Sequence, residues 1–318
     1  MKIASLLPSA TEIVCALGLE DSLVGITHEC DFPASVMAKP HMTASRISHE
    51  TMTSKEIDHA VRSQLDGHGS IYDLSEKLLA ELSPDLILTQ ELCEVCAVSY
   101  KTVEKAAHLY AADATVLSLE PHTIEDIFAN IKTVGELTGT SDRAAAVVND
   151  LRQRIEAVSA KTRDLPYLSR PKVFMLEWLE PPFAPGHWVP EQVAAAGGIC
   201  LLGTAGEKSV TINYEQIYES RPDVMVLIPC GYYTTDTCRQ LENTFFPSNW
   251  REIPAVMNDN IWALDATSYF SRPAPRVIDG IEILAKIFHP EVFGEPGASE
   301  AVRISRELIK FETPVKTQ

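Results

Sequence analysis

Short apolar runs alternate with helical patterns along the whole chain, and this alternation constrains the fold more than any other feature. Strands that alternate with helices build a parallel, doubly wound sheet. We therefore expect an α/β body in the first half of the chain. Its expected strands are Ile3–Leu7, Leu23–Thr27, Asp85–Thr89 and Thr115–Leu119, and its expected helices are Ser9–Leu17, Ser54–Leu65, Leu74–Leu82, Val98–Tyr110 and Thr123–Leu137.

The pattern restarts after a polar, proline-marked break at Asp164–Pro171. Before it, Ser141–Thr162 predicts one helix of roughly 30 Å, enough to connect two lobes. We expect an N-terminal α/β lobe over 1–140, a connecting helix over 141–165 and a C-terminal α/β lobe over 166–318. The expected strands of the second lobe are Lys172–Trp178, Asp223–Ile228 and Ile261–Leu264.

The N-terminus carries one lysine and then apolar residues, as a signal peptide does. Glu12 interrupts the apolar region, and Ser9 with Glu12 predicts a helix capping box instead. If Met1 is the native start, we expect a cytoplasmic protein whose seven cysteines stay reduced; if a signal was removed, we expect a periplasmic or extracellular one.

The net charge of −17 would repel both a phosphate backbone and an anionic membrane surface. Apolar runs are broken within about ten residues, short of the roughly 20 that a spanning helix requires. We expect no nucleic-acid partner, no membrane insertion and a monomer.

Two segments echo each other across the halves: L-S-P-D-L-I-L-T-Q-E-L-C and S-R-P-D-V-M-V-L-I-P-C-G. Each is a helix end, a Pro-Asp, a buried strand and a cysteine near the strand's carboxyl end. Ligands of open α/β sheets bind beyond the carboxyl ends of the strands. Cys93, Cys96 and Cys230 are therefore expected to face one crevice between the lobes.

Several motifs together resemble the cobalamin and iron-siderophore binding proteins of ABC importers. They are S-L-L-P-S-A-T-E-I, L-V-G-I-T-H-E-C-D-F-P, the L-S-P-D-L-I-L strand, P-P-F-A-P-G with A-A-A-G-G, and Y-F-S-R-P-A-P-R. The resemblance runs from Lys2 to about Pro290. It implies two Rossmann-like lobes with parallel sheets joined by one long helix, a cleft for a corrinoid or iron chelate, and an ABC permease partner. Acidic residues that meet the transporter in the family would correspond here to Glu94 or Glu104.

The chain departs from this family in three respects. It shows no signal segment, it has Thr89-Gln90 where vitamin B12-binding relatives have an aromatic residue, and it places cysteines in the predicted cleft. These departures indicate a difference in ligand or chemistry.

The Cys-x-x-Cys of Cys93 and Cys96 has three open interpretations. With Cys30 and Cys230 it would offer four thiolates, which suit Zn or an iron-sulfur cluster. Alternatively, these cysteines are small buried hydrophobes, or thiols with a redox role.

Other side chains in the predicted cleft are candidate ligand contacts. The loop after the second strand groups an imidazole and two carboxylates, which coordinate cations or hydrogen-bond a chelate, although its Asp also suits a turn. Tryptophans stack on flat macrocycles or pack between helix and sheet, and the histidine beside one of them is a candidate axial ligand. An arginine pairs with a ligand carboxylate, amide or phosphate, or caps a helix. The predicted ligand contacts are His28, Glu29, Asp31, Gln90, Glu177, Trp178, His187, Trp188, Tyr232, Tyr233, Tyr269 and Arg272.

Common catalytic motifs are missing from the sequence, among them the phosphate-binding G-x-x-x-x-G-K loop, the G-x-S-x-G elbow and the H-E-x-x-H helix. We therefore predict a binding protein rather than an enzyme, one that captures a metal chelate for ABC import or intracellular handling. The alternative is a cytosolic metalloprotein that holds Zn or an iron-sulfur cluster through the four cysteines.

Overall fold

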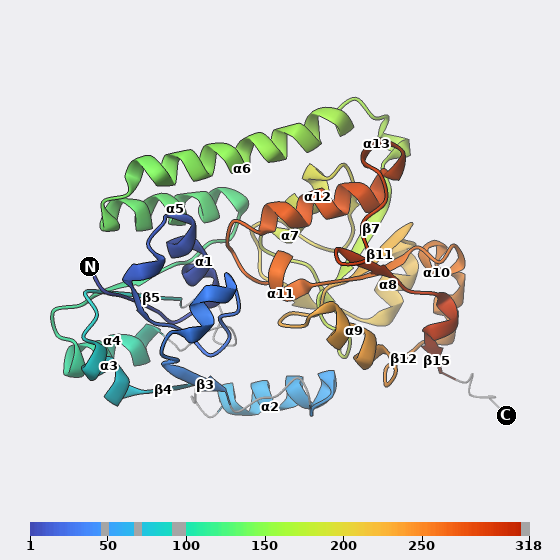
Figure 1. The fold of residues 1–318 in the computed structure, drawn as a ribbon. Coiled ribbons are helices and arrows are strands. Elements are labelled where there is room, and N and C mark those ends of the chain that lie inside the picture. Colours follow the sequence, from blue (N-terminus) through green and yellow to red (C-terminus); the bar gives the residue numbers. More distant parts are fainter. Residues whose placement is uncertain (46–50, 67–71, 91–99, 313–318) are drawn as a thin grey trace. The chain divides into compact units, whose positions relative to one another are not determined.

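The computed structural model describes residues 1–45, 51–66, 72–90 and 100–312 (Figure 1). The chain divides into two compact units. Unit 1 comprises Met1–Ser48, His59–Leu151 and Pro273–Pro275, and unit 2 comprises His49–Asp58, Arg152–Arg272 and Arg276–Gln318. Each unit contains a sheet covered by helices, so the predicted α/β class is confirmed.

Unit 1 is built on a four-stranded parallel sheet with the order β2-β1-β5-β6. All four residues of the β5 strand are buried, as its continuous apolar run predicts. The strands are β1 (Ile3–Ser5), β2 (Leu23–Gly25), β5 (Leu86–Thr89) and β6 (Thr115–Ser118). The helical elements of unit 1 are α1 (Pro8–Ala16), η1 (Glu20–Ser22), η2 (Ala34–Ala38), α3 (Glu76–Leu82), α4 (Tyr100–Tyr110) and α5 (Ile124–Thr138). Helix α2 (Ser54–Asp66) begins in unit 2 and continues into unit 1 from His59.

The predicted capping box of the first helix is wrong. Helix α1 begins one residue earlier than predicted, with Leu7 as its N-cap, and no side chain caps it. Pro8 takes the first helical position, where its fixed φ suits the helix and its missing N–H costs no hydrogen bond. Ser9 and Glu12 are buried inside the first turns instead.

A two-stranded antiparallel sheet joins β3 (Thr43–Ser45) to β4 (Tyr72–Leu74), and the sequence pattern did not predict it. The helix expected from Leu74 begins at Glu76, because Ser75 caps it by accepting a hydrogen bond from the Leu78 N–H. This small sheet places Thr43 and Tyr72 beside the loop that follows β2.

The long helix α6 spans Ser141–Thr162, as predicted. In unit 1 it packs against α5, where Gly135 allows the Ala144 side chain to approach closely. In unit 2, Arg154 of α6 is paired with Asp279 and Glu282 of α12 (Val277–Phe288), with N–O distances of 2.5 and 2.7 Å. Figure 1 shows α6 as the longest green ribbon.

Unit 2 is built on a five-stranded sheet with the order β14-β13-β11-β7-β9. Strand β14 is antiparallel to β13, and the other pairs are parallel. The strands are β7 (Lys172–Leu176), β9 (Ile199–Cys200), β11 (Val224–Leu227), β13 (Ile261–Leu264) and β14 (Ala301–Arg303), and two small sheets pair β8 (Phe183–Ala184) with β10 (Val210–Thr211) and β12 (Phe245–Phe246) with β15 (Lys310–Phe311). The remaining helical elements are η3 (Tyr167–Ser169), α7 (Val189–Ala195), α8 (Tyr214–Ser220), α9 (Thr234–Leu241), η4 (Ser248–Glu252), α10 (Pro254–Met257), α11 (Ala266–Tyr269), α13 (Pro290–Phe293) and η5 (Arg306–Leu308).

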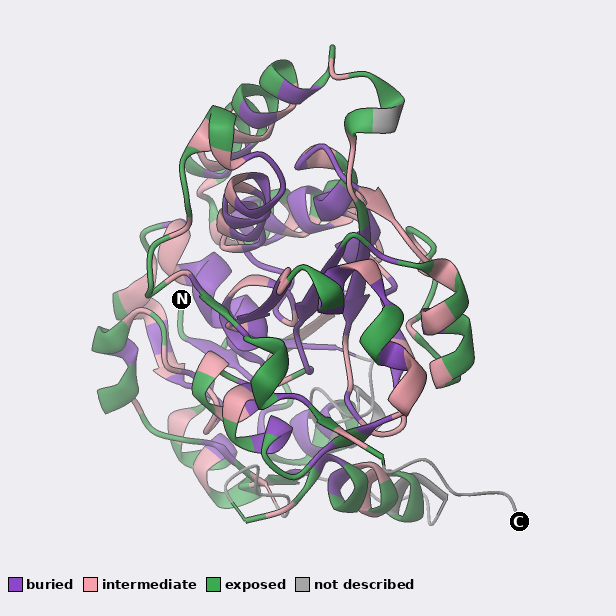
Figure 2. Cartoon of the chain, turned by 90° about the vertical axis from the view of Figure 1, so that its right-hand side faces the viewer, coloured by how far each residue is buried: buried purple, intermediate pink, exposed green. Residues whose placement is uncertain are grey.

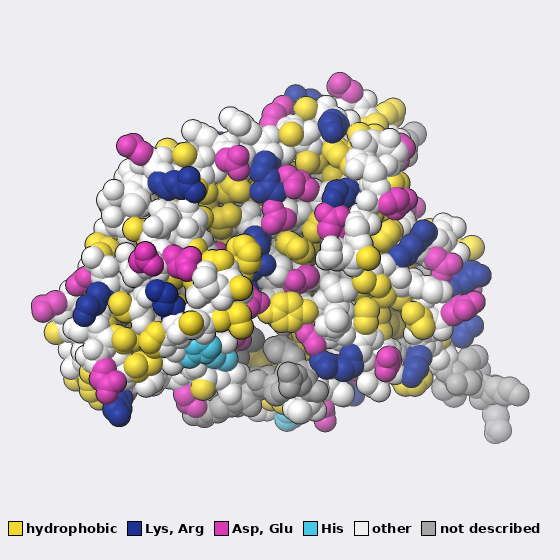
Figure 3. Space-filling model, in the orientation of Figure 1, with side chains coloured by type: hydrophobic (Ala, Val, Ile, Leu, Met, Phe, Trp, Pro, Cys, Tyr) yellow, Lys and Arg dark blue, Asp and Glu magenta, His cyan; other side chains and the backbone are white. Residues whose placement is uncertain are grey.

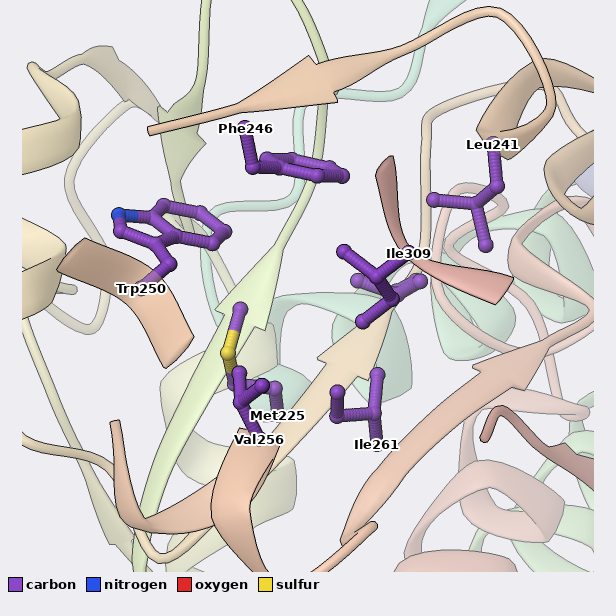
Figure 4. Close-up of a pocket in the computed structure, with 8 residues that line it drawn as sticks. Met225, Leu241, Phe246, Trp250, Val256, Ile261 and Ile309 are labelled. Atoms are coloured by element: carbon purple, nitrogen blue, oxygen red, sulfur yellow. The ribbon is translucent and has the colours of Figure 1, made fainter. Parts of the chain in front are cut away.

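The central strands β7, β11 and β13 of unit 2 are almost wholly buried, and Figure 2 shows buried strands with helices that expose their outer faces. On one side of the sheet, Phe246 stacks on Trp250 with ring centroids 4.8 Å apart. Figure 4 shows these rings with Met225, Leu241 and Ile309 around a small gap. Every side chain that lines this gap is apolar, so it belongs to the hydrophobic core and offers no polar group to a ligand.

Charged side chains of both signs are interspersed over the face seen in Figure 3. Among the helices that the structure describes, none combines the length and the apolarity that crossing a bilayer requires.

Candidate functional site

The loop that follows β2 brings His28 to the carboxyl end of the unit 1 sheet. Its Nδ1 lies 2.7 Å from Thr43 Oγ1, and its backbone N–H donates to the same oxygen at 3.2 Å. The Thr43 hydroxyl donates onward to Thr27 Oγ1 at 2.8 Å. Both threonines are buried, so this chain of hydroxyl groups holds the imidazole on its Nδ1 side.

The His28 ring remains partly open to solvent, with 23% of its side chain exposed. Burial, together with the nearby positive charge of His41, lowers the pKa of His28 below its usual value. The imidazole is therefore neutral at pH 7.

Glu29 lies beside this imidazole. Its Oε1 is 4.0 Å from His28 Nε2 and accepts a hydrogen bond of 3.0 Å from the Tyr72 hydroxyl. The Tyr72 and His28 rings are tilted against each other, with centroids 5.5 Å apart. The loop therefore presents an imidazole and a carboxylate whose positions are both set by side chains from the β3–β4 sheet.

Three further predicted residues of unit 1 differ in exposure. Cys30 is buried, and its thiol lies 3.0 Å from Thr11 Oγ1. Gln90 is buried directly after β5, whereas Asp31 is partly exposed.

Cys93 and Cys96 lie outside the described residues, so the predicted four-cysteine site stays a prediction. Of its other two members, Cys230 of unit 2 is exposed and Cys30 is buried. Within the part of the chain that the structure describes, no three His, Cys, Asp or Glu side chains are placed to hold a metal ion.

In unit 2, Glu177 follows directly after β7. Its carboxyl group accepts hydrogen bonds from the Ser209 hydroxyl and the Gly186 N–H. Burial, reinforced by the Cys230 thiol, raises the pKa of Glu177 to about 8. The carboxyl group is therefore mostly neutral at pH 7, and it ties two loops to the end of the β7 strand.

Gly186 allows these two loops to meet. A Cβ at this position would collide with the backbone of Glu207, Lys208 and Ser209. The next residue, His187, has a left-handed φ of 49° and donates its N–H to the Glu207 carbonyl. The predicted axial ligand thus sits in a tightly constrained turn whose backbone is hydrogen-bonded to the neighbouring loop.

Trp178 and Tyr232 contact each other edge to face, with ring centroids 5.3 Å apart. The Trp178 indole donates to the Ser54 carbonyl at 3.2 Å, and the Tyr232 hydroxyl lies 3.4 Å from Ser54 Oγ. The start of α2 therefore packs on these two rings within unit 2. Tyr232 is completely buried and Trp178 is partly buried.

Trp188 is 6% exposed, and its indole donates to the Phe270 carbonyl at 2.9 Å. Gln192 donates to the Tyr269 carbonyl at 2.9 Å. Arg272 is also buried. Helix α7 thus anchors the segment that follows β13, and the predicted contacts Tyr269 and Arg272 lie in this anchored segment.

Tyr233 and Cys230 differ from these neighbours because both are exposed in the turn that follows β11. The Cys230 N–H donates to the Glu177 carbonyl at 3.0 Å, which joins this turn to the β7 end. Glu177, Trp178, Cys230 and Tyr233 therefore gather at one edge of the unit 2 sheet.

Sequence reasoning missed the residues that hold the predicted ones in place. These are Thr43 and Tyr72 in unit 1, and Ser54 and Ser209 in unit 2. Each is distant in sequence from its partner, so local patterns carried no signal for it.

Both units are built on α/β sheets whose central strands are parallel, with polar and aromatic side chains at the carboxyl ends of the strands. A sequence model of the family described as periplasmic binding protein matches residues 3–267. The chain belongs to this family.

Its relatives include two proteins with curated names. The vitamin B12-binding protein of Vibrio cholerae is 24% identical over 285 residues, which cover 88% of this chain and 86% of that protein. The cobalamin-binding protein of Halobacterium salinarum is 25% identical over 295 residues, which cover 91% of this chain and 69% of that protein.

Among solved structures, a periplasmic heme binding protein from Pseudomonas aeruginosa matches with a TM-score of 0.70 and 19% identity, over 96% of this chain and 99% of that one. At this identity the likeness shows the fold. The resemblance to substrate-binding proteins of ABC importers, predicted from sequence motifs, is confirmed.

Proposed function

We propose that this chain is a substrate-binding protein that captures a metal chelate of the cobalamin type and delivers it to an ABC permease. One observation carries the proposal: the family match spans residues 3–267, and relatives named for vitamin B12 or cobalamin binding align over about nine-tenths of the chain. The alternative of a cytosolic zinc or iron-sulfur protein gains no support from these relatives.

The described residues suit such a ligand. The loop after β2 offers an imidazole and a carboxylate, and the strand ends of unit 2 offer the partly buried Trp178 and the exposed Tyr233. Flat macrocycles with amide or carboxylate edges are bound by aromatic contacts and a few directed polar groups. An interlobe cleft that contains all of these groups stays a prediction.

Delivery to a permease implies export from the cytosol, so we favour the periplasmic or extracellular location over the cytoplasmic one. A relative from Bacillus subtilis is named an ABC transporter substrate-binding lipoprotein, and aligns at 24% identity over 92% of this chain. Family membership supports a binding role rather than catalysis.

Isothermal calorimetry of the purified chain with cyanocobalamin, haemin and a ferric hydroxamate siderophore tests the proposal. We expect saturable 1:1 binding of a tetrapyrrole-type chelate. The matched variant is Trp178→Ala with Tyr233→Ala, which we expect to weaken binding, compared with Tyr167→Ala, an exposed tyrosine outside the β7 and β11 strand ends. If none of the three ligands binds, the proposal fails.

A further inference from the structure

The hydrogen bonds around His28 determine which of its ring nitrogens carries the proton. The Thr43 hydroxyl hydrogen is directed to Thr27 Oγ1, at 2.8 Å. With its hydrogen directed there, Thr43 Oγ1 acts as the acceptor in its 2.7 Å contact with His28 Nδ1, and Thr27 Oγ1 lies farther from the same nitrogen, at 3.4 Å. Consequently Nδ1 holds the hydrogen, and Nε2 of the neutral ring carries a lone pair.

This lone pair is available to a ligand. Among the described residues, none forms a hydrogen bond with Nε2, and Glu29 Oε1 lies 4.0 Å from it. That carboxylate oxygen already accepts from the Tyr72 hydroxyl at 3.0 Å. The ring keeps 23% of its side chain exposed, while the side on which Nδ1 lies is covered by buried threonines.

The arrangement has the chemistry of a metal-binding histidine. Ligating imidazoles are neutral and are oriented by a hydrogen bond that their other nitrogen donates. Imidazole nitrogen is a preferred ligand of iron, cobalt and neighbouring transition metals.

We propose that His28 Nε2 coordinates the metal of the bound chelate at an axial position, replacing an exchangeable ligand such as water. In this step one metal–oxygen bond breaks and one metal–nitrogen bond forms, the water leaves, and the oxidation state of the metal is unchanged. The inference rests on the proposed function and sharpens it. It selects planar chelates with an exchangeable axial site, and it excludes hexadentate siderophores, whose iron has no free position.

The test measures binding and coordination separately, using calorimetry and the visible absorption spectrum of the complex. Hydroxocobalamin has an exchangeable axial position, whereas cyanide occupies that position in cyanocobalamin; haemin provides an iron counterpart. We expect a shift of the absorption bands when the wild-type chain binds hydroxocobalamin or haemin, and none with cyanocobalamin. Whichever probe shifts identifies the cobalt or the iron chelate as the favoured ligand.

Two substitutions of His28 test whether its Nε2 is the metal ligand. His28→Ala should lose the shift and bind the responsive probe at least about tenfold more weakly, and added imidazole should restore the shift by filling the vacated space. The control is His108→Ala, an exposed histidine of α4, which should keep both the shift and the affinity. His28→Gln preserves a polar side chain and should also lose the shift, which guards against a folding defect in the alanine variant.

The outcomes separate the two claims. A wild-type chain that binds either probe by calorimetry without a spectral shift, or a His28→Ala variant that keeps the shift, overturns the axial role and leaves the proposed function intact. Failure of every probe to bind overturns the proposed function, and the axial role with it.

Discussion

The carboxyl strand ends of the two units use their polar groups differently. In unit 1, hydroxyl groups from neighbouring segments hold His28 from one side and leave the ring partly open. In unit 2, the polar atoms of Trp188 and Glu177 are already bonded to the protein's own loops. If the proposed function holds, we expect His28 in unit 1 to supply a directed polar contact to the ligand, and unit 2 to supply exposed groups such as Tyr233 on a hydrogen-bonded framework.

The largest effect on stability is expected at Gly186, where two loops of unit 2 approach most closely. Gly186→Val places a branched side chain against the backbone of Glu207 and Ser209, which cannot move aside. We expect a loss of more than about 3 kcal/mol in the free energy of unfolding, measured by urea denaturation. The control is Gly297→Ala, whose Cβ meets its nearest neighbour at an ordinary 3.5 Å. A Gly186→Val chain as stable as wild type would show that the two loops are not fixed.

The next effect concerns the buried carboxyl group. Because the pKa of Glu177 is raised from 4.5 to about 8 in the folded chain, the native state holds more protons than the unfolded state between these values. Stability should therefore fall as pH rises from about 5 to 8, with a contribution of at most about 1.4 kcal/mol per pH unit.

Replacing this residue checks the sign. Glu177→Gln should flatten this part of the pH dependence in denaturation measurements at pH 5, 6.5 and 8, whereas Glu219→Gln, at an exposed position, should leave it unchanged. A slope that persists in the Glu177→Gln chain would assign the pH dependence to other groups.

A smaller effect is expected at Trp188. Trp188→Phe keeps most of the buried ring but removes the N–H that donates to the Phe270 carbonyl. We expect a loss of about 1–2 kcal/mol in unfolding free energy, because a buried acceptor loses its partner. Thermal unfolding followed by circular dichroism measures it. An unchanged midpoint would mean that water replaces the indole at this carbonyl.

The smallest effect on stability, with a selective effect on binding, is expected at Thr43. Thr43→Val removes the acceptor that orients His28 Nδ1 while nearly conserving the side-chain volume. We expect the affinity for hydroxocobalamin to fall about three- to tenfold, as for loss of a partner that orients a metal ligand. Thr133→Val, on the exposed side of α5, is the control. If the two variants bind hydroxocobalamin equally well, the hydrogen bond between Thr43 and His28 does not contribute to ligand binding.

Much of this fold was predictable from local pattern. The bounds of α6 and the buried strand β5 follow from helical periodicity and from a continuous apolar run. The β3–β4 sheet was not predictable, because its two strands are three residues long and lie far apart in sequence. The first helix was predicted with the wrong cap, because Pro8 outweighs the Ser9 signal.

The sequence predicted which residues form the candidate site, but it did not predict the residues that hold them in place by hydrogen bonds. His28 and Glu29 follow a recognisable strand, yet the hydroxyls of Thr43 and Tyr72 that position them come from the unpredicted β3–β4 sheet. The same holds for Glu177, whose partner Ser209 lies 32 positions further along the chain. Single-sequence patterns describe neighbours along the chain, whereas these contacts depend on the tertiary fold.

The most direct test is calorimetric titration of hydroxocobalamin into two variants, one from each strand-end region. The account predicts that His28→Ala weakens binding at least about tenfold, whereas Trp188→Phe binds as the wild type does once folded. The opposite pattern, with full affinity in His28→Ala and lost affinity in Trp188→Phe, would contradict the account that His28 of unit 1 contacts the ligand while Trp188 of unit 2 has a structural role.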